Sequence, residues 1–131
     1  MSWLEGRCSE FGGIHDEGMK NDTGLAFYEP HEANLRPDIF LPAPADNPSQ
    51  ETWKRLRPDF PYIALNLPHY YERSDAQKTP FKITNPKTKQ WVIAFVVDRG
   101  PGAKGRVVDL SPCIMARLRI ETDDIVQVDF L

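Results

Sequence analysis

Two aspartates in the second half of the chain have the residue type and spacing for acid–base chemistry. Asp98 ends one apolar run and Asp109 follows another, eleven positions later. A short turn between two strands would return the chain and bring both carboxylates to one rim of a sheet. Close carboxylates repel, which raises the pKa of one and lets it donate a proton while the other stays ionised. That is the minimum set of groups for attack on a glycosidic bond.

Each aspartate also has a purely structural interpretation. Asp98 precedes Arg99, and a turn aspartate can pair with Arg99 or Arg106 or accept hydrogen bonds from nearby amides. Asp109 precedes Leu-Ser-Pro, which is typical of a helix N-cap worth about 1 kcal/mol. The residues alone leave catalysis and these structural roles open.

The elements that must position these aspartates are mainly strands. Twelve prolines and eight glycines are many for a helical chain, because proline removes a backbone donor and fixes φ. The run 90–97 is strongly β-prone and is expected to be buried on both faces, with Trp91 and Phe95 in the core. One short helix is expected at 113–118, after a start signal at 109–112. The other expected strands are 7–11, 25–28, 62–65, 81–84, 106–108 and 125–130.

The chain is expected to form one domain over residues 1–131, with a long insertion at about 29–61. This segment is polar and rich in proline, and a turn of helix is expected at 50–56 after Asn47-Pro48-Ser49. Loops of this length inside a small domain are uncommon and are often functional.

Composition excludes several classes of protein. A net charge of −3 argues against nucleic acid as the main partner. No run approaches the ~20 apolar residues needed to span a bilayer, and no secretory signal is visible at the N-terminus. Cys8 and Cys113 lack metal-ligand spacing, and the sequence leaves open whether they pair. No phosphate-binding loop or zinc-ligand pattern is present, so we expect no cofactor and no metal.

An ordered string of residues follows the run 90–97: Asp98-Arg99-Gly100-Pro101, then Gly105-Arg106, then Val107-Val108-Asp109-Leu110-Ser111. At these positions the sequence resembles the RlpA-like double-psi β-barrel family. The family stretch similar to "DRGP…GR-hydrophobic-hydrophobic-DLS" leads into a short helix and a last strand, and the similarity spans about 62–130. A weaker resemblance to the opening of expansin-like domains covers Glu10-Phe11-Gly12-Gly13 and Asp16 to Gly18.

The resemblance implies an all-β fold, a six-stranded double-psi β-barrel with one short helix, and two candidate catalytic residues. Asp98 takes the place of the catalytic aspartate of RlpA-type lytic transglycosylases. Asp109 aligns with the aspartate of the His-Phe-Asp-like motif in expansins, family-45 glucanases and MltA-type lytic transglycosylases. Here Val107-Val108 stand in place of His-Phe.

Five further residues are expected to contact the polymer: Asp16, His69, Tyr70, Arg99 and Arg106. Asp16 lies in a glycine-flanked loop that would line a groove. RlpA enzymes carry a histidine before a Leu-Pro pair, and here His69 follows such a pair and would substitute for it. Tyr70 lies in a polar stretch and offers a flat ring on which a sugar can stack.

The resemblance implies a cell-wall polysaccharide, such as a peptidoglycan glycan strand, as the partner. A lytic transglycosylase or glycan hydrolase is one expected function. A non-catalytic, expansin-like binding module is the first alternative, and an intracellular barrel with an unrelated ligand is the second. We expect a monomer. The family implies a location outside the cytoplasm, although the missing signal leaves localisation open.

Overall fold

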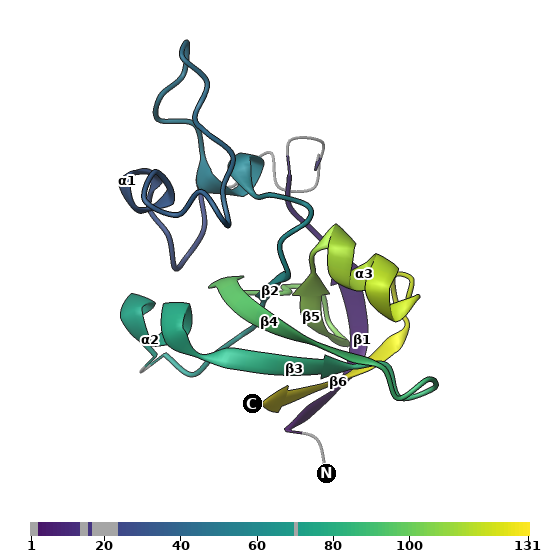
Figure 1. The fold of residues 1–131 in the computed structure, drawn as a ribbon. Coiled ribbons are helices and arrows are strands. Elements are labelled where there is room, and N and C mark those ends of the chain that lie inside the picture. The colour runs from purple at the N-terminus through teal and green to yellow at the C-terminus, as the bar shows by residue number, and fades with distance from the viewer. Residues whose placement is uncertain (1–2, 14–15, 17–23, 70) are drawn as a thin grey trace.

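A computed structural model describes residues 3–13, 16, 24–69 and 71–131 of the chain. Strands make up most of its regular structure, and Figure 1 shows them gathered beneath the long segment that precedes β2. The elements in chain order are β1 (Leu4–Glu10), α1 (Pro30–Ala33), a 3-10 helix (Thr52–Arg55), β2 (Tyr62–Ala64), α2 (Arg73–Lys78), β3 (Pro80–Thr84), β4 (Trp91–Asp98), β5 (Arg106–Leu110), α3 (Pro112–Leu118) and β6 (Ile125–Phe130).

The six strands close into a barrel in the order β1-β5-β2-β4-β3-β6. Two neighbouring pairs, β1 with β5 and β2 with β4, are parallel, and the other four pairs are antiparallel. The prediction of an all-β, six-stranded barrel is therefore confirmed. Because the barrel is closed, each strand has a partner on both sides and the main-chain groups of its rungs are satisfied within the sheet.

The barrel interior is filled by alternate residues of the strands. In β4, Ala94 and Val96 are fully buried, whereas Trp91 is 52% exposed and Ile93 also lies at the surface. Phe95 is only half-buried and is not part of the core cluster. The expectation that Trp91 and Phe95 belong to the core is therefore wrong. Successive strand residues point to opposite faces, and only one face of the first half of β4 meets the core.

The insertion at 29–61 is a packed layer with its own buried side chains. Ile39, Phe40, Trp53 and Leu56 are all nearly inaccessible and belong to the same hydrophobic cluster as the barrel core. Main-chain bonds from Leu41 to Arg55 (2.7 Å) and from Arg57 to Ile39 (2.9 Å), with a bridge between Phe40 and Leu56, close the segment on itself. The predicted helical turn near 50–56 is confirmed as the 3-10 helix.

The predicted strand at 25–28 does not form, although Leu25 and Phe27 are buried. Its amides are satisfied partly by side chains: the Leu25 N–H donates to Thr52 Oγ1 (2.9 Å) and the Ala26 N–H donates to Asp98 Oδ1 (2.8 Å). Side-chain acceptors of this kind compete with a strand ladder, so the segment stays irregular.

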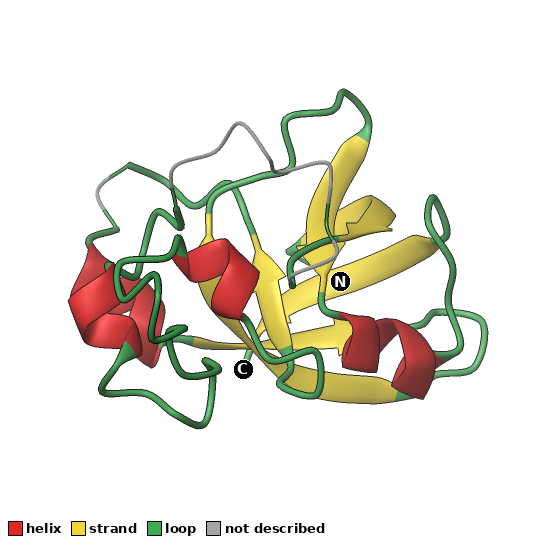
Figure 2. Cartoon of the chain, turned by 90° about the horizontal axis from the view of Figure 1, so that it is seen from above, coloured by secondary structure: helices red, strands yellow, loops and turns green. Residues whose placement is uncertain are grey.

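In the part of the chain that the structure describes, three short α-helices lie around the barrel, where the sequence predicted one. The predicted helix is α3, which begins after Ser111 with Pro112 in its first turn. Helices α1 and α2 were not predicted, and α3 lies on the other side of the barrel from them (Figure 1 and Figure 2). Among the described residues, no helix has the length and apolar character that crossing a membrane requires.

Cys8 and Cys113 are both free thiols, so no disulfide joins them.

Candidate functional site

Asp98 and Asp109 lie at the same level of the barrel, one on each side of a single residue of β2. Ala64 pairs with Asp98 of β4 and with Asp109 of β5. Adjacent strands are ~4.8 Å apart, so the two α-carbons are separated by roughly 10 Å. Paired residues of neighbouring strands share a face of the sheet. The structure therefore brings the two predicted catalytic residues to one region of the barrel.

Asp98 lies at the end of β4 and opens onto a pocket of about 350 Å³. The residues that line this pocket with it include Tyr28, Glu29 and Thr52, all from the segment that precedes β2. One carboxylate oxygen of Asp98 accepts the Ala26 N–H at 2.8 Å. Asp98 is thus held by a main-chain amide while part of its side chain remains at the pocket wall.

Asp109 lies within β5 and is not a helix cap, because Ser111 occupies the N-cap position of α3. The hydroxyl of Ser9, its partner residue on β1, donates to Asp109 Oδ1. Burial raises the pKa of Asp109. The Ser9 hydrogen bond and the charge of Arg106 oppose this increase, and the charge of Asp16 adds to it. A carboxyl group whose pKa is raised in this way gives up its proton at a higher pH than a free aspartate, which is the direction that a general acid needs.

Asp16 belongs to the same acidic region. Its Oδ2 accepts the Gly12 N–H at 2.6 Å, and its charge acts on the pKa of Asp109. The prediction that Asp16 lines a groove stays a prediction. Whether Asp16 contacts a polymer stays a prediction.

The side chain of Arg99 binds main-chain carbonyls of the segment that follows β2. Its Nη1 donates to the carbonyl of Leu67 (2.5 Å), its Nη2 donates to the carbonyl of Tyr71 (3.2 Å), and its guanidinium lies 5.0 Å from the ring centre of Phe27. Two of its five N–H donors are thus held by carbonyls of the segment after β2. Arg99 therefore fixes the loop that carries His69 rather than pairing with Asp98.

Arg106 forms a surface ion pair. Its Nε and Nη2 donate to the two carboxylate oxygens of Asp123 at 2.9 and 3.2 Å. This pairing lowers the pKa of Asp123. Arg106 influences Asp109 through its charge. Its ion pair is with Asp123, so the structural interpretation in which Arg106 pairs with Asp98 is wrong.

His69 is exposed in the loop after β2, and Tyr70 lies outside the described residues. The neighbouring Tyr71 is half-buried and packs against the core. The predicted contacts of His69 and Tyr70 with a polymer stay predictions.

Ser9 is the site residue that sequence reasoning missed. It stands 100 positions before Asp109, and only the parallel pairing of β1 with β5 brings the two together. No local pattern around Ser9 marks it. A prediction of this contact would have required the strand order of the barrel.

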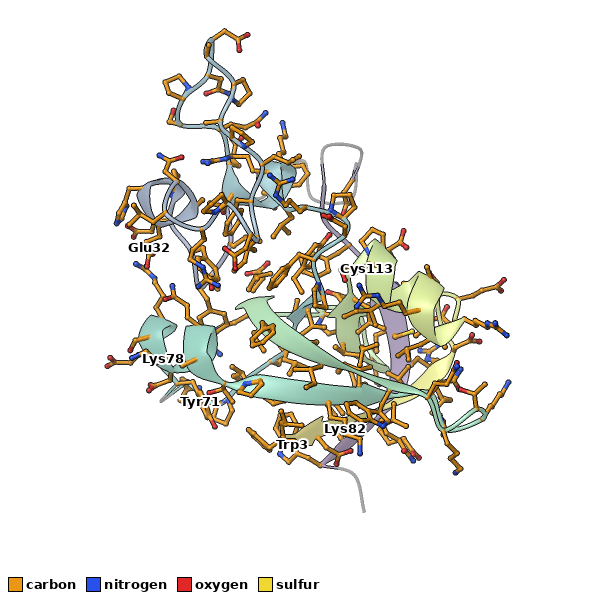
Figure 3. All side chains as sticks on the ribbon, in the orientation of Figure 1. Trp3, Glu32, Tyr71, Lys78, Lys82 and Cys113 are labelled. Atoms are coloured by element: carbon orange, nitrogen blue, oxygen red, sulfur yellow. The ribbon has the colours of Figure 1, made fainter. Side chains whose placement is uncertain are left out.

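One group of possible metal ligands is present among the described residues, at Glu29, His31 and Glu32. Both glutamates are already paired with Arg73 of α2, at 3.1 and 3.0 Å. Figure 3 shows Glu32 pointing toward α2. The guanidinium of Arg73 thus supplies the positive charge that a metal ion would otherwise bring. The ion pairs of Arg73 with the two glutamates join the insertion to α2.

The closed six-stranded barrel, which combines parallel and antiparallel strand pairs, places this protein in the class of all-β barrels. No protein-family model matches the chain, and no curated protein matches it. Among solved structures, a Streptomyces papain inhibitor is similar over 98% of this chain and 96% of its own, with 8% sequence identity and a TM-score of 0.46. A likeness of this degree carries no conclusion about activity.

Proposed function

We propose that the chain binds a cell-wall polysaccharide, such as a peptidoglycan glycan strand, beside β2 and cleaves it with Asp98 and Asp109. One observation carries the proposal: two carboxylates flank Ala64 across adjacent strands, and burial raises the pKa of Asp109. Carboxylate pairs whose environments separate their pKa values provide an acid and a base at one site.

In this mechanism Asp109 donates its proton to the oxygen of the glycosidic bond as that bond breaks. Asp98 accepts the proton of the attacking hydroxyl, which belongs either to water or to the sugar itself. Attack by water gives hydrolysis, and attack by the sugar hydroxyl gives an anhydro product, as in a lytic transglycosylase. The two proton transfers thus need one carboxyl group on each side of the bond that breaks.

The test is release of soluble fragments from purified sacculi by the wild type, Asp98→Asn and Asp109→Asn. Asp46→Asn is the matched control, because Asp46 is exposed in the insertion and outside the carboxylate region. We expect release by the wild type and the control, and at least a hundredfold less from either site variant. Mass spectrometry of the products separates hydrolysis from anhydro-sugar formation. Equal release by all four proteins would refute catalysis by these residues.

A non-catalytic binding module is the second candidate, and the hydrogen bonds of both aspartates favour it. Asp98 already accepts the Ala26 N–H and Asp109 already accepts the Ser9 hydroxyl, as structural carboxylates do. In that case the protein should pellet with sacculi and release nothing, and both site variants should pellet equally. A wild type that neither pellets nor releases fragments would contradict both candidates and favour a barrel with an unrelated ligand.

A further inference from the structure

Arg55 is a buried cation for which the described residues supply no counter-charge. Its side chain is 2% exposed, and burial lowers the pKa of its guanidinium. Its Nε donates to the carbonyl of Leu41 (3.1 Å) and its Nη2 donates to the side-chain oxygen of Asn34 (2.6 Å). Its Nη1 is buried without any hydrogen-bond partner. No described carboxylate forms an ion pair with it.

A buried guanidinium that has no counter-charge and one unpartnered N–H lowers the stability of the folded protein. Removing a charge from water carries a penalty that a nearby opposite charge normally offsets, and an unpartnered buried N–H adds to it. Arg55 is the only arginine that is buried among the described residues. Arg36 and Arg73 are more exposed and form ion pairs, Arg36 with Asp38 and Arg73 with Glu29 and Glu32. Arg55 is therefore an exception that needs an explanation.

A pocket of about 280 Å³ lies against Arg55, within the insertion. Both hydrogen-bond partners of the guanidinium, Asn34 and Leu41, also line this pocket. Most of the remaining wall is apolar, and includes Phe40, Pro42 and Ala43. The pocket thus combines one buried positive charge with a hydrophobic surround, and its volume suits a ligand of a few heavy atoms.

We propose that this pocket binds a carboxylate carried on a small apolar group, with Arg55 as its counter-charge. A carboxylate needs few donors, and the contacts of Arg55 with Leu41 and Asn34 use two of the five N–H donors of its guanidinium. A phosphate would carry more charge and more acceptor oxygens than one arginine and an apolar wall can satisfy. The free acid of a short alkyl chain and the C-terminal carboxylate of a short peptide share the required chemistry.

This pocket is separate from the residues proposed to cleave a glycan, so its test does not depend on that activity. The ¹⁵N-labelled protein is titrated at constant chloride with propionate, N-acetylalanine, N-acetylalaninamide and inorganic phosphate. The reporters are the Arg55 Nε–H signal and the backbone amides of 33–43. Arg55→Met removes the charge, Ala43→Leu fills the pocket while keeping the charge, and Arg117→Met is the control because Arg117 is exposed on α3.

We expect saturable shifts with the two carboxylates in the wild type and in Arg117→Met, and at least tenfold weaker binding in Arg55→Met and Ala43→Leu. If Arg55→Met does not fold, the comparison of ligand binding by Ala43→Leu and by the wild type decides the test. Tighter binding of N-acetylalanine than propionate identifies a peptide C-terminus as the source, and equal binding identifies a free short acid. A linear response, equal binding of the amide or of phosphate, or unchanged affinity in Ala43→Leu overturns the proposal.

Discussion

Gly100 lies so close to Asp109 that a single methyl group there should disturb the candidate site. A Cβ at this position would lie 3.1 Å from Asp109 Oδ2 and 3.7 Å from the Cβ of Ala64. Gly100 also has φ of +148°, which L side chains rarely adopt. Backbone strain of this kind costs about 1–3 kcal/mol. For Gly100→Ala we therefore expect a loss of about 2 kcal/mol, which lowers Tm by roughly 5–10 °C in a chain of this size.

Gly102→Ala is the matched control, because a Cβ there meets no atom within 4 Å and the backbone needs no positive φ. We expect it to change the free energy of unfolding by less than about 0.5 kcal/mol. Urea unfolding compares both variants with the wild type, and an NMR pH titration follows the Asp109 carboxyl. Equal stability of the two variants, or an Asp109 titration unchanged in Gly100→Ala, would refute the close contact.

Three further substitutions test other parts of the structure. Because burial raises the pKa of Asp109, its contribution to stability is complete below about pH 4 and is lost as pH rises through the raised pKa. Asp109→Asn should therefore be as stable as the wild type at low pH and more stable at neutral pH, as urea unfolding across this range will show. Tyr62→Phe should cost about 1–3 kcal/mol in urea unfolding, since the buried Phe11 carbonyl loses the hydroxyl that donates to it at 2.7 Å. Arg99→Met should speed hydrogen exchange of amides near Leu67 and Tyr71 and leave exchange in the strands unchanged, because both carbonyls lose their donors.

Most of the barrel follows from local patterns in the sequence. The alternating run 125–130 forms β6 with the expected bounds, and the strands at 62–64, 80–84 and 106–110 lie within two residues of their predicted positions. These runs are rich in β-branched and aromatic residues and are bounded by turn residues, so that local preference and tertiary packing agree.

The predictions from the sequence fail where a contact with a residue far away in the chain determines the local structure. Leu25 to Tyr28 has the composition of a strand, but Thr52 and Asp98 satisfy two of its amides. Asp109 resembles a helix cap because Leu-Ser-Pro follows it, yet pairing with β1 and β2 extends β5 through this residue. In the candidate site, the sequence identified the two aspartates, while Ser9 depended on the parallel pairing of strands far apart in the chain.

The pairing of the first strand with the last has a mechanical consequence. β1 and β6 are antiparallel, Leu4 lies opposite Val128, and the Trp3 N–H donates to Asp129 Oδ1 at 2.9 Å. The two ends of the chain consequently lie on the same side of the barrel (Figure 1). Tension applied across them would load the rungs between β1 and β6 one after another, as in unzipping. The barrel should thus open under low force from this seam, with β2 and its flanking aspartates among the later parts to be pulled apart.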